Sequence, residues 1–259
     1  MSVRNDLIED IKDISGIQSG VAISIGAVKE SSTVVKFGHC PDAQTAVETD
    51  AWELGASIPV YVFPDELGEA ITIQSSDAGD SQSVVVEVLD TAGLEVTKTV
   101  TLNGLTPVAI PGDVIAVNRA YNNDSSVFAG DISIKGAVSG NTFAFIDARE
   151  QQTTQCIYMI PSNKYGAVVN LSSSMNTGGN QDSASIFRFV SQLPGKVFRT
   201  QVRYGLQQRG TSNISSNITL PPVYPPMTRL KISLTPDSVQ DISAEMSIQL
   251  IDSDYIESL

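Results

Sequence analysis

Short runs of β-branched and aromatic residues recur along most of the chain, with Gly, Pro, Asn and Asp between them. Such runs are typical of strands, and the small and polar residues between them are typical of turns. No second helical period of useful length follows the first fifteen residues. The pattern therefore predicts an all-β fold. In the middle of the chain the strand candidates are residues 58–63, 70–74, 84–89, 95–102, 108–110, 114–119 and 131–135.

Residues 84–110 carry the turn chemistry of two hairpins. Asp90–Gly93 separates two β runs, and Asn103-Gly104 tolerates the positive φ of a type I′ turn. We expect an antiparallel meander here. In its second strand the threonines share one face and the apolar side chains share the other, so one face packs and the other is wetter. The apolar side chains are Val96, Val100 and Leu102.

A Gly- and Ser-containing joint at residues 137–141 separates two series of strands. We expect exposed loops at residues 172–183 and 205–219, which are rich in Ser, Gly, Asn and Gln. The spacing predicts two tandem β-sandwich units, 51–137 and 138–259, with jelly-roll or related Greek-key connections left open. Strand candidates of the second unit are residues 142–146, 156–160, 167–171, 184–190, 197–204, 229–234 and 244–251.

Residues 1–50 resemble an N-terminal arm more than a domain. One short amphipathic helix is expected at residues 5–15, because apolar side chains recur there at helical spacing on one face. Two short strands, 21–28 and 33–37, follow it. The apolar face of the helix consists of Leu7, Ile8, Ile11 and Ile14.

The balance of charge limits the partners. The chain has 29 acidic and 16 basic residues, a net charge of −13, so a phosphate backbone or an anionic lipid surface would repel it. Cys40 and Cys156 form neither a disulfide framework nor a zinc-ligand cluster. The first residues lack the basic, apolar and small-residue succession of a signal peptide, and no apolar run reaches the roughly 20 residues of a membrane span. We expect a soluble protein, made in a cytoplasm, that binds neither nucleic acid nor membrane.

Candidate catalytic groups are few. Histidine chemistry would depend on His39, which is the sole histidine and stands beside Cys40. Neighbouring residues of an extended segment point to opposite sides, so a thiolate–imidazole pair is the weaker interpretation and a turn residue beside a structural thiol is the stronger one.

Carboxylates offer a second route to catalysis, because paired acids cleave glycosides. The candidates lie in loop-like sequence without the aromatic platforms of a sugar cleft, and Trp52 is better interpreted as a core or interface anchor. The acidic loop 75–80 does not fit the calcium-loop pattern, and phosphate-binding glycine motifs are absent. We therefore predict no enzyme, cofactor or metal. The four carboxylates considered are Asp65, Glu66, Asp77 and Asp80.

Several segments, in order, resemble a family of virion structural proteins of tailed phages of the marine phage type. The most distinctive is the run Val88–Gly104, and the resemblance covers residues 36–259. The first 35 residues extend beyond the family's usual start, and Pro226–Leu230 replaces a more acidic segment. Other matching segments are Lys36–Gly38, Pro41-Asp42, Ala51–Glu53, Ile71–Asp77, Asn118–Tyr121, Gly130–Ile134, Tyr158–Pro161, Gly195–Thr200 and Ser243–Asp252.

The resemblance implies a non-enzymatic virion protein assembled in the host cytoplasm. We expect a capsid decoration, cement or vertex protein that binds itself as a homo-oligomer, for instance a trimer, and other virion proteins such as the major capsid protein. The alternative is a tail, collar or fibre component, or a receptor- or glycan-binding module. Interface anchors are predicted on the arm helix and in the first unit, with intramolecular core packing as the competing interpretation. They are Leu7, Ile8, Ile11, Ile14, Trp52 and Tyr61.

Overall fold

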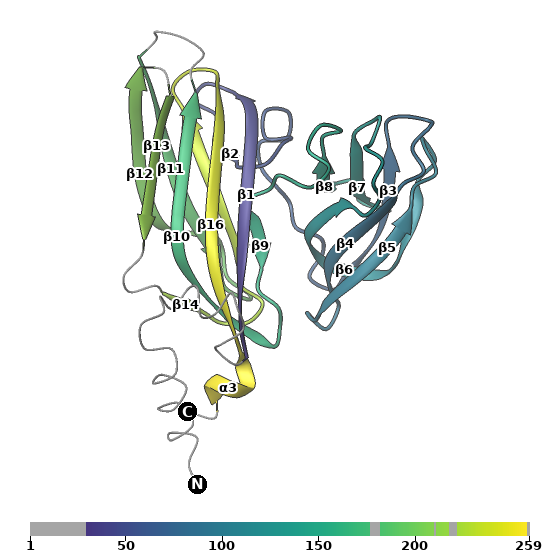
Figure 1. Ribbon diagram of the computed structural model, residues 1–259. Coiled ribbons are helices and arrows are strands. Elements are labelled where there is room, and N and C mark those ends of the chain that lie inside the picture. Colours follow the sequence, from purple (N-terminus) through teal and green to yellow (C-terminus); the bar gives the residue numbers. More distant parts are fainter. Residues whose placement is uncertain (1–29, 177–181, 210, 218–221, 258–259) are drawn as a thin grey trace.

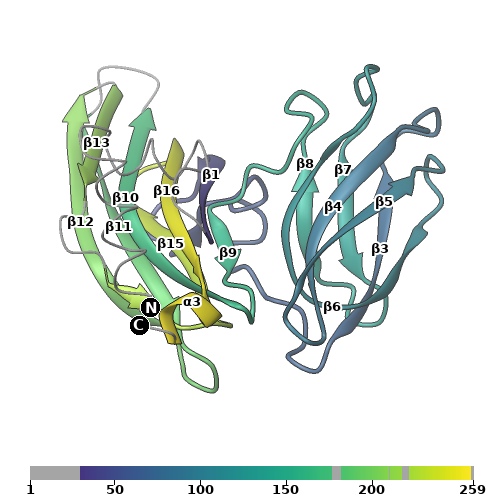
Figure 2. The ribbon, with the colours of Figure 1, turned by 60° about the horizontal axis from the view of Figure 1, so that its bottom comes forward.

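The computed structural model describes residues 30–176, 182–209, 211–217 and 222–257, and this part of the chain is almost entirely antiparallel β-structure. Two β units lie side by side, and β1 and β9 of the larger unit lie on the side that faces the smaller one (Figure 1, Figure 2). The only helix in the described ranges is α3, Ser253–Glu257. The all-β fold that the hydrophobic pattern predicts is confirmed.

The larger unit consists of two sheets packed face to face. The first has the order β1–β16–β10–β13, with β14 beside β10, and the second has the order β12–β11–β15–β2, with β9 beside β15. The strands of the first sheet are β1 (Ser31–Ala43), β10 (Lys164–Asn176), β13 (Thr211–Asn217), β14 (Val223–Tyr224) and β16 (Gln240–Asp252). Those of the second sheet are β2 (Thr49–Asp50), β9 (Ile157–Met159), β11 (Asp182–Gln192), β12 (Arg199–Arg209) and β15 (Arg229–Pro236).

The strand order of the larger unit is that of a jelly roll. When its eight main strands are numbered from one to eight along the chain, the first sheet reads 1–8–3–6 and the second reads 2–7–4–5. The chain therefore passes repeatedly from one sheet to the other, as it does in the eight-stranded double Greek key. The jelly-roll connection that the strand spacing left open is the one observed in this unit.

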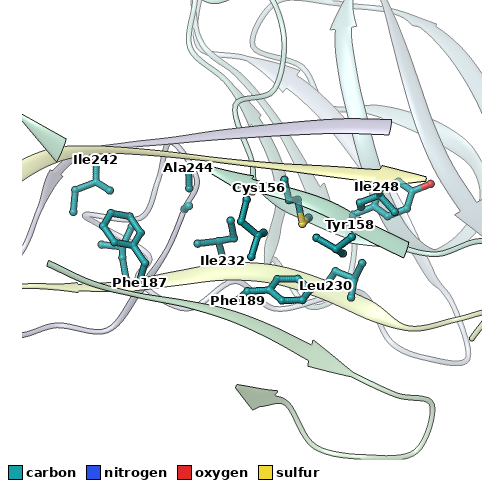
Figure 3. Close-up of a cluster of buried hydrophobic side chains, with 14 of the residues drawn as sticks. Cys156, Tyr158, Phe187, Phe189, Leu230, Ile232, Ile242, Ala244 and Ile248 are labelled. Carbon is teal, nitrogen blue, oxygen red and sulfur yellow. The ribbon is translucent and has the colours of Figure 1, made fainter. Parts of the chain in front are cut away.

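Period-two alternation builds the core of the jelly roll. Every second side chain of β16 is buried from Ile242 to Leu250, and the side chains between them are partly exposed. Phe187 and Phe189 of β11 and Ile232 of β15 meet this face from the opposite sheet (Figure 3). A slip of one residue would turn the apolar face of β16 to solvent, so the alternation specifies the register.

The smaller unit is one six-stranded sheet with the order β5–β4–β6–β3–β7–β8. It curls into a half-barrel because β6 pairs with β3 up to Val114 and with β4 from Val114 onward. Gly112, with a φ of 81°, lies at this change of partner. The strands are β3 (Glu69–Ser75), β4 (Ser83–Asp90), β5 (Glu95–Thr101), β6 (Val108–Asn122), β7 (Ile132–Gly136) and β8 (Thr142–Ile146).

Strand pairing corrects the predicted division of the chain. Residues 31–50 were expected in an arm, but β1 pairs along most of its length with β16, and β2 pairs with β15. β8 lies beyond the predicted boundary at residue 137, yet it pairs with β7. The smaller unit is therefore inserted between the second and third main strands of the jelly roll, and the two units are not in tandem. Local pattern identifies a strand but not its distant partner, which is why the boundary was misplaced.

Two local expectations also change. The turn at Asn103-Gly104 forms, but residues 108–110 pair with β3 and not with β5, so the meander stops at the β4–β5 hairpin. The Ser- and Gln-rich segments expected as loops instead extend strands β10 and β12 and form β13. The predicted helix at residues 5–15 lies outside the described residues.

Candidate functional site at the junction of the two units

Apolar side chains from both units fill the junction between them. Ile115 and Ala116 contribute from the outer face of β6, and Ile157 and Met159 contribute from β9. This explains why β6 is buried on both faces between Val114 and Asn118: one face covers the half-barrel core and the other covers the jelly roll. The remaining buried members of this junction cluster are Trp52, Tyr61, Phe63 and Leu89.

Trp52 and Tyr61, predicted as interface anchors, pack within the chain at this junction. Their side chains are 1% and 3% exposed, and their rings meet edge to face with centroids 5.3 Å apart. The indole Nε1 of Trp52 donates to Ile58 O at 3.0 Å, and the Tyr61 hydroxyl donates to Phe143 O at 2.9 Å. Burial raises the pKa of the Tyr61 hydroxyl. The four predicted arm anchors, Leu7, Ile8, Ile11 and Ile14, lie outside the described residues.

Buried polar contacts also join the units. The Asn118 side chain, on β6, donates to Met159 O at 3.1 Å and accepts from Met159 N at 3.0 Å, which completes a two-way bridge to β9. The Gln155 amide donates to Val117 O at 3.0 Å. Lys36, on β1, donates to Asn118 O, and burial lowers its pKa to about 8. These bonds satisfy buried backbone groups of both units, so the junction behaves as an interior rather than as a loose contact.

A buried ion pair fastens the segment that leads into the smaller unit. The Asp50 carboxylate accepts from Lys231 Nζ at 2.6 Å and from Ser233 Oγ at 2.7 Å. It also accepts from the backbone N–H of Tyr61 at 2.8 Å, so the aromatic cluster and the second jelly-roll sheet are held by one carboxylate. Removing one partner of such a pair leaves an uncompensated charge in the interior.

Arg229 lies at the open edge of the junction. Its guanidinium is 4.8 Å from the centroid of the Phe63 ring, 3.3 Å from Glu66 Oε1 and 3.4 Å from Gln192 Oε1. A hollow of about 170 Å³ opens here between Glu66 of the smaller unit and the β11–β12 hairpin of the jelly roll. Its floor is apolar and includes Ile115 and Met159.

A second hollow, of about 320 Å³, shares Leu193 with the first. Val197 and Val223, which both line it, are 72% and 59% exposed. Lys196 and Arg199 add positive charge, and neither forms an ion pair within the described parts of the chain.

Tyr224 also lines this second hollow, and its hydroxyl is buried. It makes no hydrogen bond of ordinary geometry. Burial raises the pKa of Tyr224 to about 12, and nearby Ser191 offsets part of the rise. The two adjoining hollows therefore form an exposed surface of mixed apolar and basic character.

His39 and Cys40 do not form a catalytic pair. Cys40 points into the jelly-roll core, where burial raises the pKa of its thiol to about 12. His39 Nδ1 instead lies 3.2 Å from Glu53 Oε2, a contact that raises the pKa of the imidazole. Thr154 donates to the same carboxylate oxygen at 3.0 Å. The histidine therefore has a structural partner, and the thiol is un-ionised at neutral pH.

The four candidate carboxylates are not brought together in a cleft. Asp80 accepts from Ser75 Oγ at 2.6 Å and from the backbone N–H groups of Ala129 and Gly130. Asp77 and Asp65 each accept from a backbone N–H two residues further on, as in Asx-turns. Glu66 contacts Arg229 at the junction. These acids fasten loops and the unit boundary, and no two of them are arranged as an acid–base pair.

The described residues contain no group of three or more His, Cys, Asp and Glu side chains placed to hold a metal ion. The acidic loop 75–80 is joined to neighbouring loops by the bonds of Asp80. A search of the same residues for membrane-spanning segments finds no helix with the necessary length and apolar character.

Sequence reasoning missed the junction charges and the exposed hollows. A usable signal was present in the local charge balance. Residues 182–231 contain seven Lys and Arg against one acid, whereas residues 51–150 contain four basic against fourteen acidic residues. The net charge of −13 hides this separation, because it averages an acidic unit with a basic sheet.

No family model matches the chain, and neither does any curated protein. Among solved structures, the cowpea mosaic virus top component, described as naturally occurring empty particles, is 9% identical over 72% of this chain and 82% of that chain, with a TM-score of 0.23. The VP2 subviral particle of infectious bursal disease virus is 9% identical over 90% of this chain and 75% of that chain, with a TM-score of 0.26. A tandem CBM22 domain of Paenibacillus barcinonensis Xyn10C is 7% identical over 86% of this chain and 92% of that chain, with a TM-score of 0.22.

Proposed function

We propose that this chain is a non-enzymatic structural protein of a virus particle, which acts by self-association and by contact with other particle proteins. The observation that carries the proposal is the strand order of the larger unit, 1–8–3–6 packed on 2–7–4–5. Viral capsid domains share the jelly roll with lectin domains and cupins, so this step is an analogy at the level of the fold.

The chemistry of the junction supports this proposal over an enzyme. A catalytic acid, base or nucleophile needs a reactive protonation state and access to substrate. Here Asp50 and Lys231 neutralise one another in the interior, His39 pairs with Glu53, and the thiol of Cys40 is held un-ionised by burial. The buried polar side chains form hydrogen bonds and ion pairs that hold the two β units together. A structural subunit needs such a rigid body.

Within this class we favour a capsid decoration, cement or vertex protein. The resemblance of residues 36–259 to tailed-phage virion proteins supports a place in the particle. The compact pair of β units lacks the heptads or slender repeats of a fibre shaft. The protein would bind the shell and other copies of itself through exposed mixed surfaces such as the one beside Val197 and Val223.

A receptor- or glycan-binding tail, collar or fibre component is the second candidate. The observation that favours it is the open second hollow with the buried Tyr224 hydroxyl, on a fold that lectins also use. This candidate predicts saturable binding of the purified protein to host cells, which soluble host glycans would compete away.

Cryo-electron microscopy of intact particles, with this chain fitted into the map, tests the proposal. We expect density for both β units on the icosahedral shell or at its vertices. Density confined to the tail or collar would favour the second candidate, and absence of the protein from purified particles would overturn the proposed function.

A further inference from the structure

Two adjoining hollows lie between an acidic segment of the smaller unit and a basic part of the jelly roll. The acidic tip, defined here as Asp65, Glu66, Leu67 and Asp113, belongs to the smaller unit. Leu67 is 88% exposed, and among the large apolar side chains of the smaller unit only Val138 is more exposed. A Cβ placed on Gly68 would lie 3.2 Å from Asp113 Cβ, so the turn before β3 lies against β6 at Asp113.

The basic groove, defined here as Lys196, Val197, Arg199 and Val223 around the second hollow, belongs to the jelly roll. Its two valines are strongly exposed, and its two cations have no ion-pair partner among the residues that the structure describes. Exposed apolar side chains beside unpaired charge are typical of an interaction surface rather than of a solvated face.

The first hollow connects the acidic tip to the basic groove. Glu66 and the hairpin residues Gln192–Gly195 line its opposite sides, and Leu193 lines both hollows. Glu66 of the tip therefore lies across one hollow from the hairpin that also borders the groove. A two-fold axis near the hairpin would set the tip of one copy against the groove of the other, and the symmetry would repeat that contact.

We propose that the tip and the groove form the contact between two copies of the chain, in a closed two-fold dimer. Leu67 of each copy enters the basic groove of the other copy and contacts its valines. Asp65 and Asp113 of the tip then face Lys196 and Arg199 of that groove. The inference rests on the proposed function and names the surface and the partner for its self-association. It gives dimers as the unit of assembly in place of the trimer expected above.

Charge complementarity selects a second copy as the partner. The smaller unit is acidic and the sheet that bears the groove is basic, so each copy supplies what the other lacks. Electrostatic attraction between such surfaces raises the rate of association, and added salt weakens this attraction. The same charges prevent tip-to-tip and groove-to-groove contact, which makes the contact directional.

Charge-swap variants of the full chain test the contact by sedimentation velocity and native mass spectrometry. A groove variant combines Lys196→Glu with Arg199→Glu, and a tip variant combines Asp65→Lys with Asp113→Lys. Each variant alone is expected to weaken dimerisation by about a hundredfold or more, because both symmetric contacts become repulsive. A mixture of the two variants is expected to restore a dimer that contains one copy of each.

A matched control carries the same change of charge on another surface. Lys135→Glu with Arg149→Glu alters exposed cations of the smaller unit away from the hairpin. This control is expected to dimerise like the wild type. Leu67→Ser, at an exposed position, removes the apolar contact without changing charge and is expected to weaken dimerisation about tenfold. Circular dichroism melts of all variants confirm that they fold.

The outcomes separate this inference from the proposed function. Equal dimerisation of the wild type, the groove variant and the tip variant overturns the contact but leaves self-association through another surface. A trimer or a ladder of larger species overturns the two-fold arrangement. A wild-type chain that stays monomeric at every concentration overturns this inference together with self-association, whereas cryo-electron microscopy decides the place in the particle independently.

Discussion

Single residues in this protein owe their roles to what surrounds them more than to their chemical type. Asp80 belongs to an acidic loop with several side-chain oxygens, yet its carboxylate is nearly fully buried beneath three hydrogen-bond donors. Burial raises the pKa of this group, but hydrogen bonds from Ser75, Ala129 and Gly130 lower it further than burial raises it. The acid therefore acts as a structural acceptor that ties three loops together.

Replacing Asp80 with alanine should lower the free energy of unfolding by about 3 kcal/mol, because buried donors lose their acceptor. Urea denaturation at neutral pH measures this loss. The control is Glu150→Ala, an exposed acid outside the proposed dimer contact, for which we expect a change within about 0.5 kcal/mol. Equal effects of the two substitutions would contradict the structural role of Asp80. Because the folded pKa is lowered from 3.8, this contribution is present above that value and is lost as pH falls through the folded pKa.

His39 should make stability depend on pH in the opposite direction. Its contact with Glu53 raises the pKa of the imidazole above 6.5, with smaller contributions from Asp241 and Glu150. The stabilising contribution is therefore fully present below pH 6.5 and is lost as pH rises through the folded pKa. Denaturation midpoints across this range should fall for the wild type and vary less for His39→Gln. The same slope in both proteins would rule out this histidine as the source.

At the scale of elements, local signals predict strands and their faces better than their partners. The β4–β5 hairpin forms as the Asp90–Gly93 turn predicts, and Gly93 adopts a φ of 76°. Val100 and Leu102 are buried on one side, and the threonines at 97, 99 and 101 are exposed on the other. Pairing of β6 with β3 was missed, because no local signal favours that partner over β5.

Polar strands were missed for a related reason. Serine and asparagine in residues 211–217 are typical of loops, but β13 pairs with β10 through seven register positions. Backbone hydrogen bonds to a neighbouring strand do not depend on apolar side chains, so a partner can hold a sequence of low β-propensity in a sheet. Tertiary context overrides propensity here.

Gly38 tests whether β1 belongs to the jelly roll. A Cβ at this position would lie 2.0 Å from Ala51 O and 2.5 Å from Cys156 N, two backbone atoms that cannot move independently of the sheet. Gly38→Ala should therefore destabilise the protein by roughly 3 kcal/mol or more, measured by thermal or urea unfolding. Gly205→Ala on β12 is the matched control, since its nearest neighbour would be at an ordinary 3.7 Å. A mild effect of Gly38→Ala would place β1 outside the packed sandwich.

At the scale of the whole molecule, the junction makes two β units into one cooperative body. Its apolar cluster and the buried pair of Asp50 and Lys231 join sequence-distant segments. We expect a single unfolding transition for the wild type, because neither unit can separate without exposing this interior.

Asn118→Ala should weaken that coupling. The substitution leaves the N–H and C=O of Met159 without partners at a buried boundary, at a cost of roughly 2–4 kcal/mol. Differential scanning calorimetry should then resolve two transitions in place of one. Asn123→Ala, at an exposed position just beyond β6, should leave the single transition unchanged. A single unshifted transition in Asn118→Ala would locate the coupling elsewhere.

The sequence by itself determined the fold class, most strands of both units and the directions in which their side chains point. Period-two alternation and turn residues act over a few positions. They therefore predict a strand or a turn even when the neighbouring strand is unknown. It also indicated correctly that His39 and Cys40 face opposite sides.

Only the tertiary structure decided that the smaller unit is inserted into a jelly roll, that Trp52 and Tyr61 lie inside the chain, and that an acidic tip adjoins a basic groove. These features bring together residues that lie tens to hundreds of positions apart. Chain topology and long-range packing, rather than local preference, select such neighbours.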